Sequence, residues 1–344
     1  MPVYFHPTEL ERFGKELLIK LGFPTQHSEI ISKSLVLANL RGVDSHGVVR
    51  LSYYSDGVEK GLINPNPKIK IVKDDRYFTL IDGDNTLGYV PATMATEKAI
   101  LKAKEYGIGV SGVRNLKHSG MLAKYVMQAV EEKMFALAIA NASPNIALPG
   151  FKRPVVGTNP LAIGFPVDGS TPIILDMAMS VVARGKLLVA SKKGTPIPKG
   201  WALNENGEET TDPNEAIKGM LLPIGGYKGF GLAVAIDILC GIVLGGGYGL
   251  KIQRSWFSQG GFLILVSRLD MARSYEEYLN DIREYVREMK STPVAEGVKV
   301  LFPNEIEEEL TCKRMKEGIP IDEETFSELV KLAKKYGIEE PKSL

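Results

Sequence analysis

Two of the four histidines in the chain stand beside residues that suit chemistry on a small organic acid. His46 and Arg50 lie in the segment DSHGVVRLSYY, residues 44–54, and a helix that opens after Asp44 would place them on one face. A guanidinium binds a carboxylate through two parallel hydrogen bonds, and a neighbouring imidazole can polarise or protonate a carbonyl group. The pair therefore indicates a site for a 2-oxo acid. The alternative is a partly exposed helix face that binds nothing.

The second histidine, His118, lies in the segment NLKHSGM, residues 115–121, between a predicted strand at 107–113 and a predicted helix from about Gly120. This order places His118 and Ser119 at a helix N-terminus, where the helix dipole disfavours an imidazolium ion. A histidine that loses its proton readily near neutral pH suits general acid–base catalysis. The alternative is that His118 or Ser119 only caps the helix.

Two further segments could hold a ligand. In GGYKGFG, residues 225–231, glycines surround Lys228 at the start of an apolar helix, and free N–H groups with a lysine make an anion site. In LDMAMSVVARGK, residues 175–186, Asp176 ends a predicted strand, where ligands often bind in α/β proteins. The alternatives are a flexible loop for the first segment and a helix cap for the second.

The chain lacks the fingerprint GxGxxG between a strand and a helix that marks a Rossmann-type dinucleotide site. Its nearest glycine cluster, GGGYGL at 245–250, follows a predicted helix and precedes none, which indicates a helix C-cap and a loop. If the chain binds a dinucleotide, the pyrophosphate must be held elsewhere.

The elements that must position these residues change in type along the chain. The N-terminal part predicts amphipathic helices, the middle predicts strands mixed with helices, and the C-terminal part is helical and charged again. This α+β order within an α/β protein predicts two domains. A helical domain would comprise 1–70 and 274–344, and a ligand-binding domain would comprise 71–273.

Charge and apolar patterning exclude several classes of protein. The net charge is +1 with no long run of one sign, so neither a nucleic acid nor a membrane surface is an expected partner. The apolar stretch 230–244 is too short to span a bilayer and predicts a buried helix. Cys240 and Cys312 form no disulfide framework or metal cluster, and the N-terminus lacks a secretory signal. We therefore expect a cytoplasmic protein without a structural metal.

Together these segments resemble the malate/L-lactate dehydrogenase family, which is distinct from the Rossmann-type lactate dehydrogenases. Its relatives include sulfolactate, ureidoglycolate and diketogulonate oxidoreductases and a reductase of cyclic imino acids. The resemblance covers almost the whole chain and rests on the order and spacing of five motifs: DSHG with Arg50, 115–119 with His118, GTNP at 157–160, LDMAMS at 175–180 and GGYKG at 225–229. It implies a non-Rossmann nicotinamide-binding domain, a helical domain and assembly as a homodimer.

The resemblance also implies roles for individual residues. His46 and Arg50 match substrate-side residues, and His118 matches the acid–base histidine of some members, although members differ in which histidine has this role. Tyr54 and Thr158 are expected near the substrate. The cofactor, NAD or NADP, is expected to contact three segments that comprise Pro172, Ile173, Ile174, Leu175, Asp176, Met177, Ala178, Tyr227, Lys228, Asn304 and Glu305.

One departure from the family pattern concerns the segment NASP, where Ala142 and Ser143 stand in place of the Ser and Asp that some relatives carry near the nicotinamide. This puts an acidic helper at that point in doubt. The expected reaction is hydride transfer between nicotinamide C4 and C2 of a small 2-hydroxy acid, with malate or lactate as the leading substrate and a histidine moving the proton. The alternatives are reduction of a cyclic imino acid through the same carboxylate clamp, and a non-enzymatic small-molecule binding protein.

Overall fold

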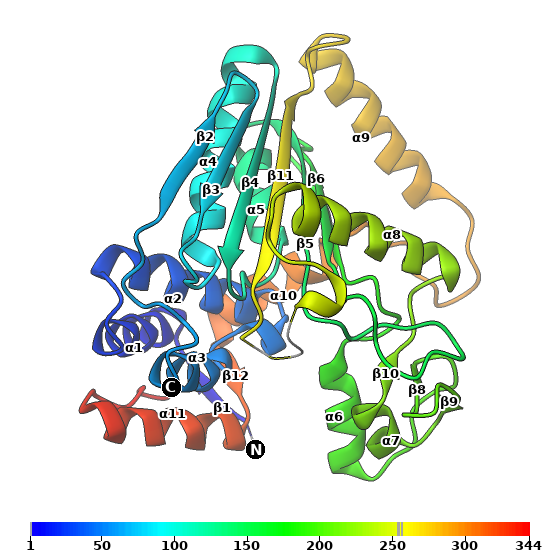
Figure 1. Ribbon diagram of the computed structural model, residues 1–344. Coiled ribbons are helices and arrows are strands. Elements are labelled where there is room, and N and C mark those ends of the chain that lie inside the picture. The colour runs from blue at the N-terminus through cyan, green and yellow to red at the C-terminus, as the bar shows by residue number, and fades with distance from the viewer. Residues whose placement is uncertain (1, 253–254, 256) are drawn as a thin grey trace.

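The computed structural model describes residues 2–252, 255 and 257–344 and is built around a seven-stranded mixed sheet (Figure 1). Its strand order is β2-β3-β4-β11-β5-β6-β7. β3 and β4 run parallel, and every other neighbouring pair is antiparallel. The strands are β2 Lys70–Asp74, β3 Phe78–Asp82, β4 Ile108–Leu116, β5 Met134–Ala140, β6 Leu161–Phe165, β7 Ile173–Met177 and β11 Gly260–Arg268.

This strand order places the C-terminal ends of β4, β5 and β7 at the same end of the sheet, which is called the sheet edge below. The last residues of β4 and β5 pair with the first residues of β11, and the last residue of β7 pairs with the first residue of β6. Side chains that follow these three strands therefore gather along one edge, although they are far apart in the sequence. Carboxyl ends of strands are where ligands commonly bind in open α/β sheets.

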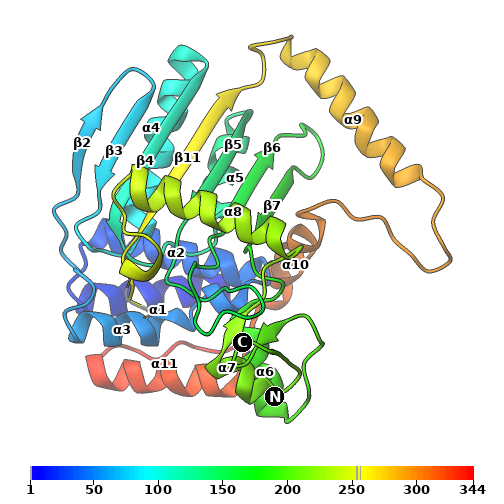
Figure 2. The same ribbon diagram turned by 45° about the vertical axis from the view of Figure 1, so that its right-hand side comes forward.

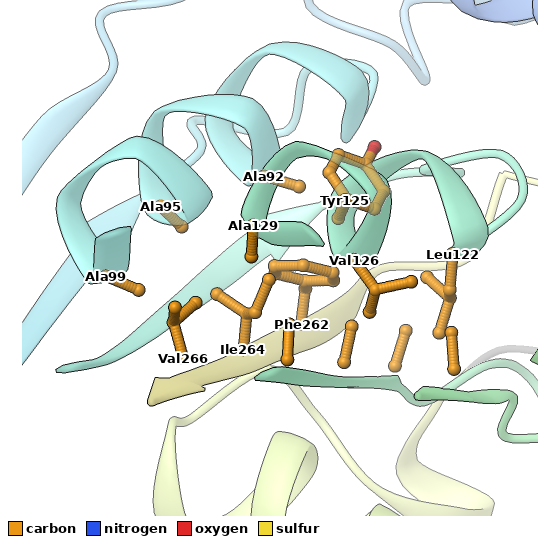
Figure 3. Close-up of a cluster of buried hydrophobic side chains, with 14 of the residues drawn as sticks. Ala92, Ala95, Ala99, Leu122, Tyr125, Val126, Ala129, Phe262, Ile264 and Val266 are labelled. Atoms are coloured by element: carbon orange, nitrogen blue, oxygen red, sulfur yellow. The ribbon is translucent and has the colours of Figure 1, made fainter. Parts of the chain in front are cut away.

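Small side chains allow helices to pack closely on one face of the sheet. α4 (Tyr89–Tyr106) turns a row of fully buried alanines toward the strands: Ala92, Ala95 and Ala99 (Figure 3). Beside it, α5 (Ala123–Glu131) contributes Tyr125, whose ring centroid lies 4.9 Å from that of Phe262 on β11. The alanines recur every three or four residues, which is the spacing that keeps one helix face against the sheet.

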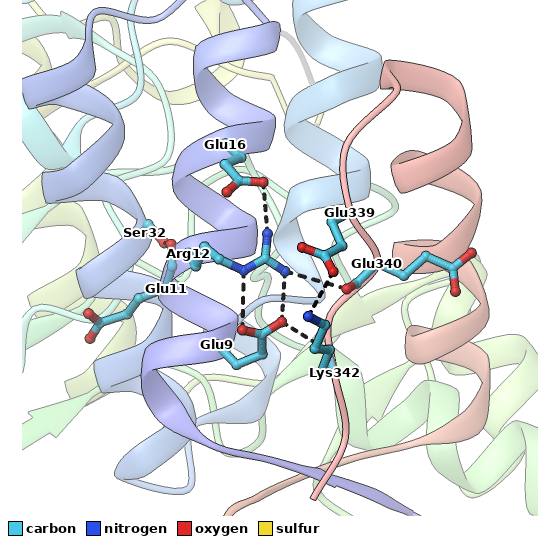
Figure 4. A network of polar contacts seen from close by, with 8 residues as sticks. All are labelled: Glu9, Glu11, Arg12, Glu16, Ser32, Glu339, Glu340 and Lys342. Atoms are coloured by element: carbon cyan, nitrogen blue, oxygen red, sulfur yellow. Dashed lines mark hydrogen bonds and ion pairs between the residues drawn. The ribbon is translucent and has the colours of Figure 1, made fainter.

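Helices from both chain ends pack together next to this sheet (Figures 1 and 2): α1 Pro7–Lys20, α2 Thr25–Leu40, α3 Arg50–Glu59 and α11 Glu323–Tyr336. They share one hydrophobic core and a small sheet in which β1 (Val3–Phe5) pairs with β12 (Ile319–Ile321). Arg12 of α1 links the two chain ends, because its guanidinium donates to the carbonyl oxygen of Glu340 (Figure 4). Glu9, in the same helix, pairs with this guanidinium at 2.7 Å.

The chain between β7 and β11 forms a small lobe and an apolar helix. α8 (Tyr227–Asp237) crosses the sheet face opposite α4 and α5 and continues as a π-helical turn, Ile238–Val243 (Figure 1). After β11, α9 (Tyr275–Ser291) projects from the sheet, and α10 (Glu305–Glu317) returns to α2 (Figure 2). The remaining elements are α6 Arg184–Lys193, β8 Ala202–Leu203, β9 Glu209–Thr210, α7 Pro213–Lys218, β10 Met220–Leu221 and 3-10 turns at Asp44–His46 and Gly249–Lys251.

The structure confirms the mixed α/β class, and the loop expected at 245–250 is found except that a 3-10 turn begins at Gly249. It corrects one expectation about the apolar stretch. The pattern at 230–244 predicts a buried helix, whereas Leu232, Ile242 and Val243 are 53%, 54% and 66% exposed. The stretch is apolar on all sides, and the sheet covers only one of them. No helix in the described part of the chain is long and apolar enough to cross a membrane.

The predicted domain boundaries stay a prediction. α9, which a boundary at 274 would group with the terminal helices, lies beside the sheet instead (Figure 2). Tyr278 Oη donates to the carbonyl oxygen of Pro166 at 2.9 Å, and Tyr275 Oη donates to Asp168 at 3.1 Å. Both acceptors lie in the turn between β6 and β7.

Candidate active site

His46 and Arg50 are positioned by a sharp turn and not by a single helix. His46 ends a 3-10 turn and α3 begins only at Arg50, so the predicted helix opening after Asp44 is wrong. The buried side chain of Asn39 organises this turn, because it accepts a backbone N–H at 2.8 Å and donates to Asp44 at 2.7 Å. Gly47 permits the close approach, since a Cβ at that position would lie 2.1 Å from Asn39 Oδ1. A contact made by a residue at the end of α2 thus overrides the local helical pattern.

His118 lies in a loop and not at the helix N-terminus that the sequence predicts. α5 begins five residues later at Ala123, whose N–H donates to Asp176 Oδ2 at 2.7 Å. The positive end of the helix dipole therefore acts on Asp176, and the predicted dipole effect on His118 is wrong. Tyr125 helps to hold the loop, because its hydroxyl donates to the carbonyl oxygen of Ser119 at 2.7 Å.

The structure brings the two histidines together, which the sequence pattern did not indicate. The ring centroids of His46 and His118 are 5.3 Å apart. His118 Nδ1 lies 2.7 Å from the hydroxyl oxygen of Tyr54, which lies 2.9 Å from that of Tyr89. The two tyrosines are 3% and 1% exposed. Residues from α3, α4 and the loop after β4 therefore form one hydrogen-bonded cluster, and Tyr89 is a member that sequence reasoning missed.

A small pocket lies beside this cluster, where α3 meets the loop after β4. Its lining comprises Arg50, Tyr53, Tyr54, Ile63, Leu87, Lys117, His118 and Phe257. Among these described residues, two carry a positive charge and none carries a negative charge. The apolar walls lower the local polarity, which strengthens attraction to an anion. Sequence reasoning missed Lys117, for which adjacency to His118 was the only available signal.

Burial keeps the titratable groups of the cluster uncharged at neutral pH. Burial lowers the pKa of His46 to about 4, and the positive charge of Arg50 contributes to this. Burial also lowers the pKa of His118 well below its ordinary value, with smaller contributions from Arg50 and His46. For the phenols the direction reverses: burial raises the pKa of Tyr89 to about 12 and that of Tyr54 well above its ordinary value. A bound anion would raise the histidine pKa values again.

Asp176 stands at the end of β7, as the sequence predicts. β7 is the outermost strand of the described sheet, so its outer backbone groups have no strand partner. The residue is exposed on this edge, yet surrounding protein desolvates its carboxyl group and raises its pKa to about 6. The hydrogen bond from Ala123 and the charge of Arg41 oppose this rise without cancelling it.

Asn304 is a buried link between two elements. It is 2% exposed and adopts a φ of 90° just before α10. Its Oδ1 accepts from Arg41 at 2.5 Å, and its Nδ2 donates to the carbonyl oxygen of Pro172 at 2.9 Å. The carboxylate of Glu305 pairs with Lys290. The cofactor role that the resemblance implies for Asn304 and Glu305 stays a prediction.

Tyr227 and Lys228 begin α8 on an exposed rim next to β7. The residues before them, Gly225 and Gly226, have φ values of 59° and 63°, which side chains other than glycine rarely adopt. A backbone hydrogen bond of 2.9 Å from Ile224 joins this loop to the chain that leaves β7. The exposed helix start therefore lies near the end of β7, whereas the side chain of Asp176 points to the other face of the sheet, toward α5.

These features fit a dinucleotide. The exposed start of α8 together with Lys228 suits a pyrophosphate, and the carboxylate of Asp176 suits the hydroxyl groups of a ribose. β4 and β7 are four strand spacings apart in the sheet, roughly 19 Å. The edge between His118 and Asp176 therefore suits an elongated ligand.

Thr158 lies apart from the residues that line the pocket. Its carbonyl oxygen accepts the N–H of Met179 at 2.7 Å. The neighbouring Asn159 is fully buried, accepts the N–H of Ala142 at 3.0 Å and donates to the carbonyl oxygen of Ala233 at 2.7 Å. This part of the GTNP motif thus ties the end of β5 to α8, a structural role that sequence reasoning missed. The expected contact of Thr158 with the substrate stays a prediction.

Known proteins share both the sequence and the fold. The family model described as malate/L-lactate dehydrogenase matches residues 5–330. A malate dehydrogenase of Pyrococcus abyssi is 36% identical over 341 residues, covering 96% of this chain and 94% of the relative. A ureidoglycolate dehydrogenase (NAD(+)) of Escherichia coli is 31% identical over 327 residues, covering 93% of each. The solved sulfolactate dehydrogenase of Methanocaldococcus jannaschii has a TM-score of 0.91 at 36% identity and covers 98% of both chains.

The matched range includes both histidines, the cationic pocket and the β7 edge. The structural match extends over the terminal helices as well as the sheet, so it is not confined to a single motif. The chain therefore belongs to the malate/L-lactate dehydrogenase family and is a 2-hydroxy-acid dehydrogenase that uses a nicotinamide cofactor.

Proposed function

We propose that the chain interconverts a small 2-hydroxy acid and a 2-oxo acid that carry a second negative charge, with malate and oxaloacetate as the simplest pair. One observation carries this proposal: two cationic side chains, Arg50 and Lys117, line the same pocket. Lactate would leave one of the two cations without an anionic ligand in a partly apolar pocket, which costs free energy. A dicarboxylate, or an acid with a distal sulfonate, satisfies both.

Three of the lining residues, and His46 beside them, then have separate tasks. Arg50, whose Nε donates to the carbonyl oxygen of Ser45 at 2.6 Å, would hold the carboxylate on C1, and Lys117 would hold the distal acid group. His118 would exchange a proton with the oxygen on C2 through Nε2, because Tyr54 occupies Nδ1. His46 would contact the substrate beside C2 without moving the proton.

The cofactor, NAD or NADP, supplies the acceptor or donor of the hydride. We propose that it is held along the sheet edge by residues 172–178, with Asp176 at the ribose, and by Tyr227 and Lys228 at the start of α8. The support for this placement is the position of β7 as the outermost strand of the described sheet and the exposed, glycine-flanked start of α8. The turn with Asn304 lies next to Pro172 and would form the outer end of the same site.

Steady-state assays with reduced cofactor test the substrate proposal. Oxaloacetate should have a kcat/KM at least tenfold above that of pyruvate, since one charge-assisted hydrogen bond differs between them. Lys117→Gln should abolish this preference and leave pyruvate reduction nearly unchanged. The matched control is Lys60→Gln, an exposed lysine of the segment after α3 that pairs with Asp56. A wild-type preference for pyruvate, or turnover of a cyclic imino acid alone, would contradict the proposal.

We further propose that the chain forms a homodimer through the uncovered face of α8 and the π-helical turn. This face exposes apolar side chains at helical spacing: Leu232, Ile238, Leu239, Ile242 and Val243. Contiguous apolar patches of this kind on a folded chain mark interaction sites. Val243→Glu should shift the sedimentation coefficient from that of a dimer to that of a monomer. A monomeric wild-type protein would rule the interface out.

A further inference from the structure

The two tyrosines beside His118 form a hydrogen-bond chain to which the proposed reaction assigns no task. The hydroxyl oxygen of Tyr54 is 2.7 Å from His118 Nδ1 and 2.9 Å from the hydroxyl oxygen of Tyr89. Both phenols are buried. Among the described residues, the Tyr89 hydroxyl has no other hydrogen-bond partner. The hydrogen-bond chain therefore ends at Tyr89. The direction in which its hydrogens are donated can be deduced by counting donors and acceptors.

Each phenol has one hydrogen to donate. If Tyr89 donates to Tyr54 and Tyr54 donates to Nδ1 of His118, both hydrogens have an acceptor. If Nδ1 of His118 carries the proton instead, Tyr54 must accept it and donate to Tyr89, and the hydrogen of Tyr89 has no acceptor among the described residues. A buried donor without an acceptor is costly, so the first arrangement is the stable one. Burial raises the pKa of both phenols, so neither ionises at neutral pH.

We propose that Tyr89 and Tyr54 hold ligand-free His118 in the neutral tautomer that carries its proton on Nε2, so that the resting pocket presents an N–H group to the carbonyl oxygen of a 2-oxo acid. Oxidation of a 2-hydroxy acid needs the other tautomer, in which Nδ1 donates to Tyr54 and Tyr54 donates to Tyr89. The resting site is therefore set to bind the 2-oxo acid through this N–H group. Because a neutral imidazole that gave up this proton would be left as an imidazolate, the proton that reduction consumes must also reach His118 from solvent before the transfer. Tyr54 and Tyr89 are positioning residues, because they act on the substrate only through His118. This inference rests on the proposed role of His118 in proton transfer.

Nitrogen-15 NMR of histidine-labelled protein, without substrate or cofactor and near neutral pH, tests the tautomer directly. The signals of His118 are assigned by their loss in His118→Asn, and their chemical shifts distinguish a protonated ring nitrogen from an unprotonated one. The wild type should carry the proton on Nε2, and Tyr54→Phe should show a mixture of both tautomers. Tyr125→Phe is the matched control, because Tyr125 is equally buried and its hydroxyl bonds the neighbouring Ser119. A wild-type proton on Nδ1, or an unchanged tautomer in Tyr54→Phe, would overturn the inference.

Tyr89→Phe supplies a second test that does not depend on Tyr54→Phe folding. This variant should retain the Nε2–H tautomer, because the hydrogen of Tyr54 then has only Nδ1 as an acceptor. A shift of the proton to Nδ1 would contradict the proposed hydrogen-bond chain. In kinetics, Tyr54→Phe should reduce the ratio of the KM for the 2-hydroxy acid to the KM for the 2-oxo acid by roughly two- to tenfold, whereas Tyr125→Phe should not. An Nε2–H spectrum without turnover of any 2-oxo acid would reject the proposed function and leave the tautomer standing.

Discussion

The pocket around His118 and the rim around Asp176 and Lys228 differ in how much of each site is assembled before a ligand arrives. In the pocket, Tyr54, Tyr89 and His118 are already joined by hydrogen bonds. On the rim, Lys228 is exposed and its neighbour Tyr227 is 72% exposed. A preorganised site contributes mainly to the transition state, and an exposed cationic rim contributes mainly to binding. Substitutions in the two regions should therefore change different kinetic constants.

The strongest challenge to this comparison is His118→Asn. Loss of a general acid–base group should lower kcat at least about a hundredfold in both directions, while calorimetry shows unchanged cofactor affinity. His46→Asn is the companion variant and should raise KM more than it lowers kcat. If His46→Asn loses turnover and His118→Asn retains it, the roles of the two histidines are reversed.

Arg50→Lys tests whether geometry as well as charge is needed in the pocket. The ammonium keeps the positive charge but lacks the planar fork that binds a carboxylate through two hydrogen bonds. We expect kcat/KM to fall roughly tenfold to a hundredfold, again without a change in cofactor affinity. Wild-type kinetics in both Arg50→Lys and Arg50→Ala would show that the carboxylate is held elsewhere.

Lys228→Ala probes the rim. Loss of a charge-assisted hydrogen bond to a phosphate should weaken cofactor binding about tenfold to a hundredfold, and kcat at saturating cofactor should stay near the wild-type value. Lys218→Ala, which removes an exposed lysine of the neighbouring lobe, is the matched control and should change neither. A fall in kcat without a change in cofactor affinity would contradict the proposal that the rim acts on cofactor binding and the pocket acts on turnover.

The smallest expected effect is that of Asp176→Asn on the free energy of unfolding. The pKa of about 6 in the folded chain lies above the ordinary value of 3.8, so the ionised carboxylate disfavours folding. This contribution to stability is present below pH 4 and is lost as the pH rises through 6. The asparagine can still accept the N–H of Ala123, so the variant should be more stable than the wild type at pH 8, by on the order of 1 kcal/mol at most because the residue is exposed. Denaturant unfolding at pH 4 and pH 8 measures this, and a less stable variant at pH 8 would contradict it.

The sequence predicted the strands that carry the site better than the starts of its helices. The strand predicted at 107–113 is found as β4, Ile108–Leu116, because a short apolar run between turn residues has few alternatives. The helix starts near His46 and His118 were placed too early. In each case a side chain from a distant segment determines the local geometry: Asn39 shapes the turn before α3, and Asp176 binds the N-terminus of α5.

The sequence by itself determined the types of the elements, the motifs that indicate the family, and the chemistry available to Arg50, His118 and Asp176. Only the tertiary structure decided that the rings of the two histidines lie 5.3 Å apart, that Lys117 joins Arg50 and His118 in one pocket, and that one face of α8 stays uncovered. The reason is physical. Periodicity and residue type report on a window of a few residues, whereas contacts along the sheet edge depend on the strand order, which places β11 between β4 and β5.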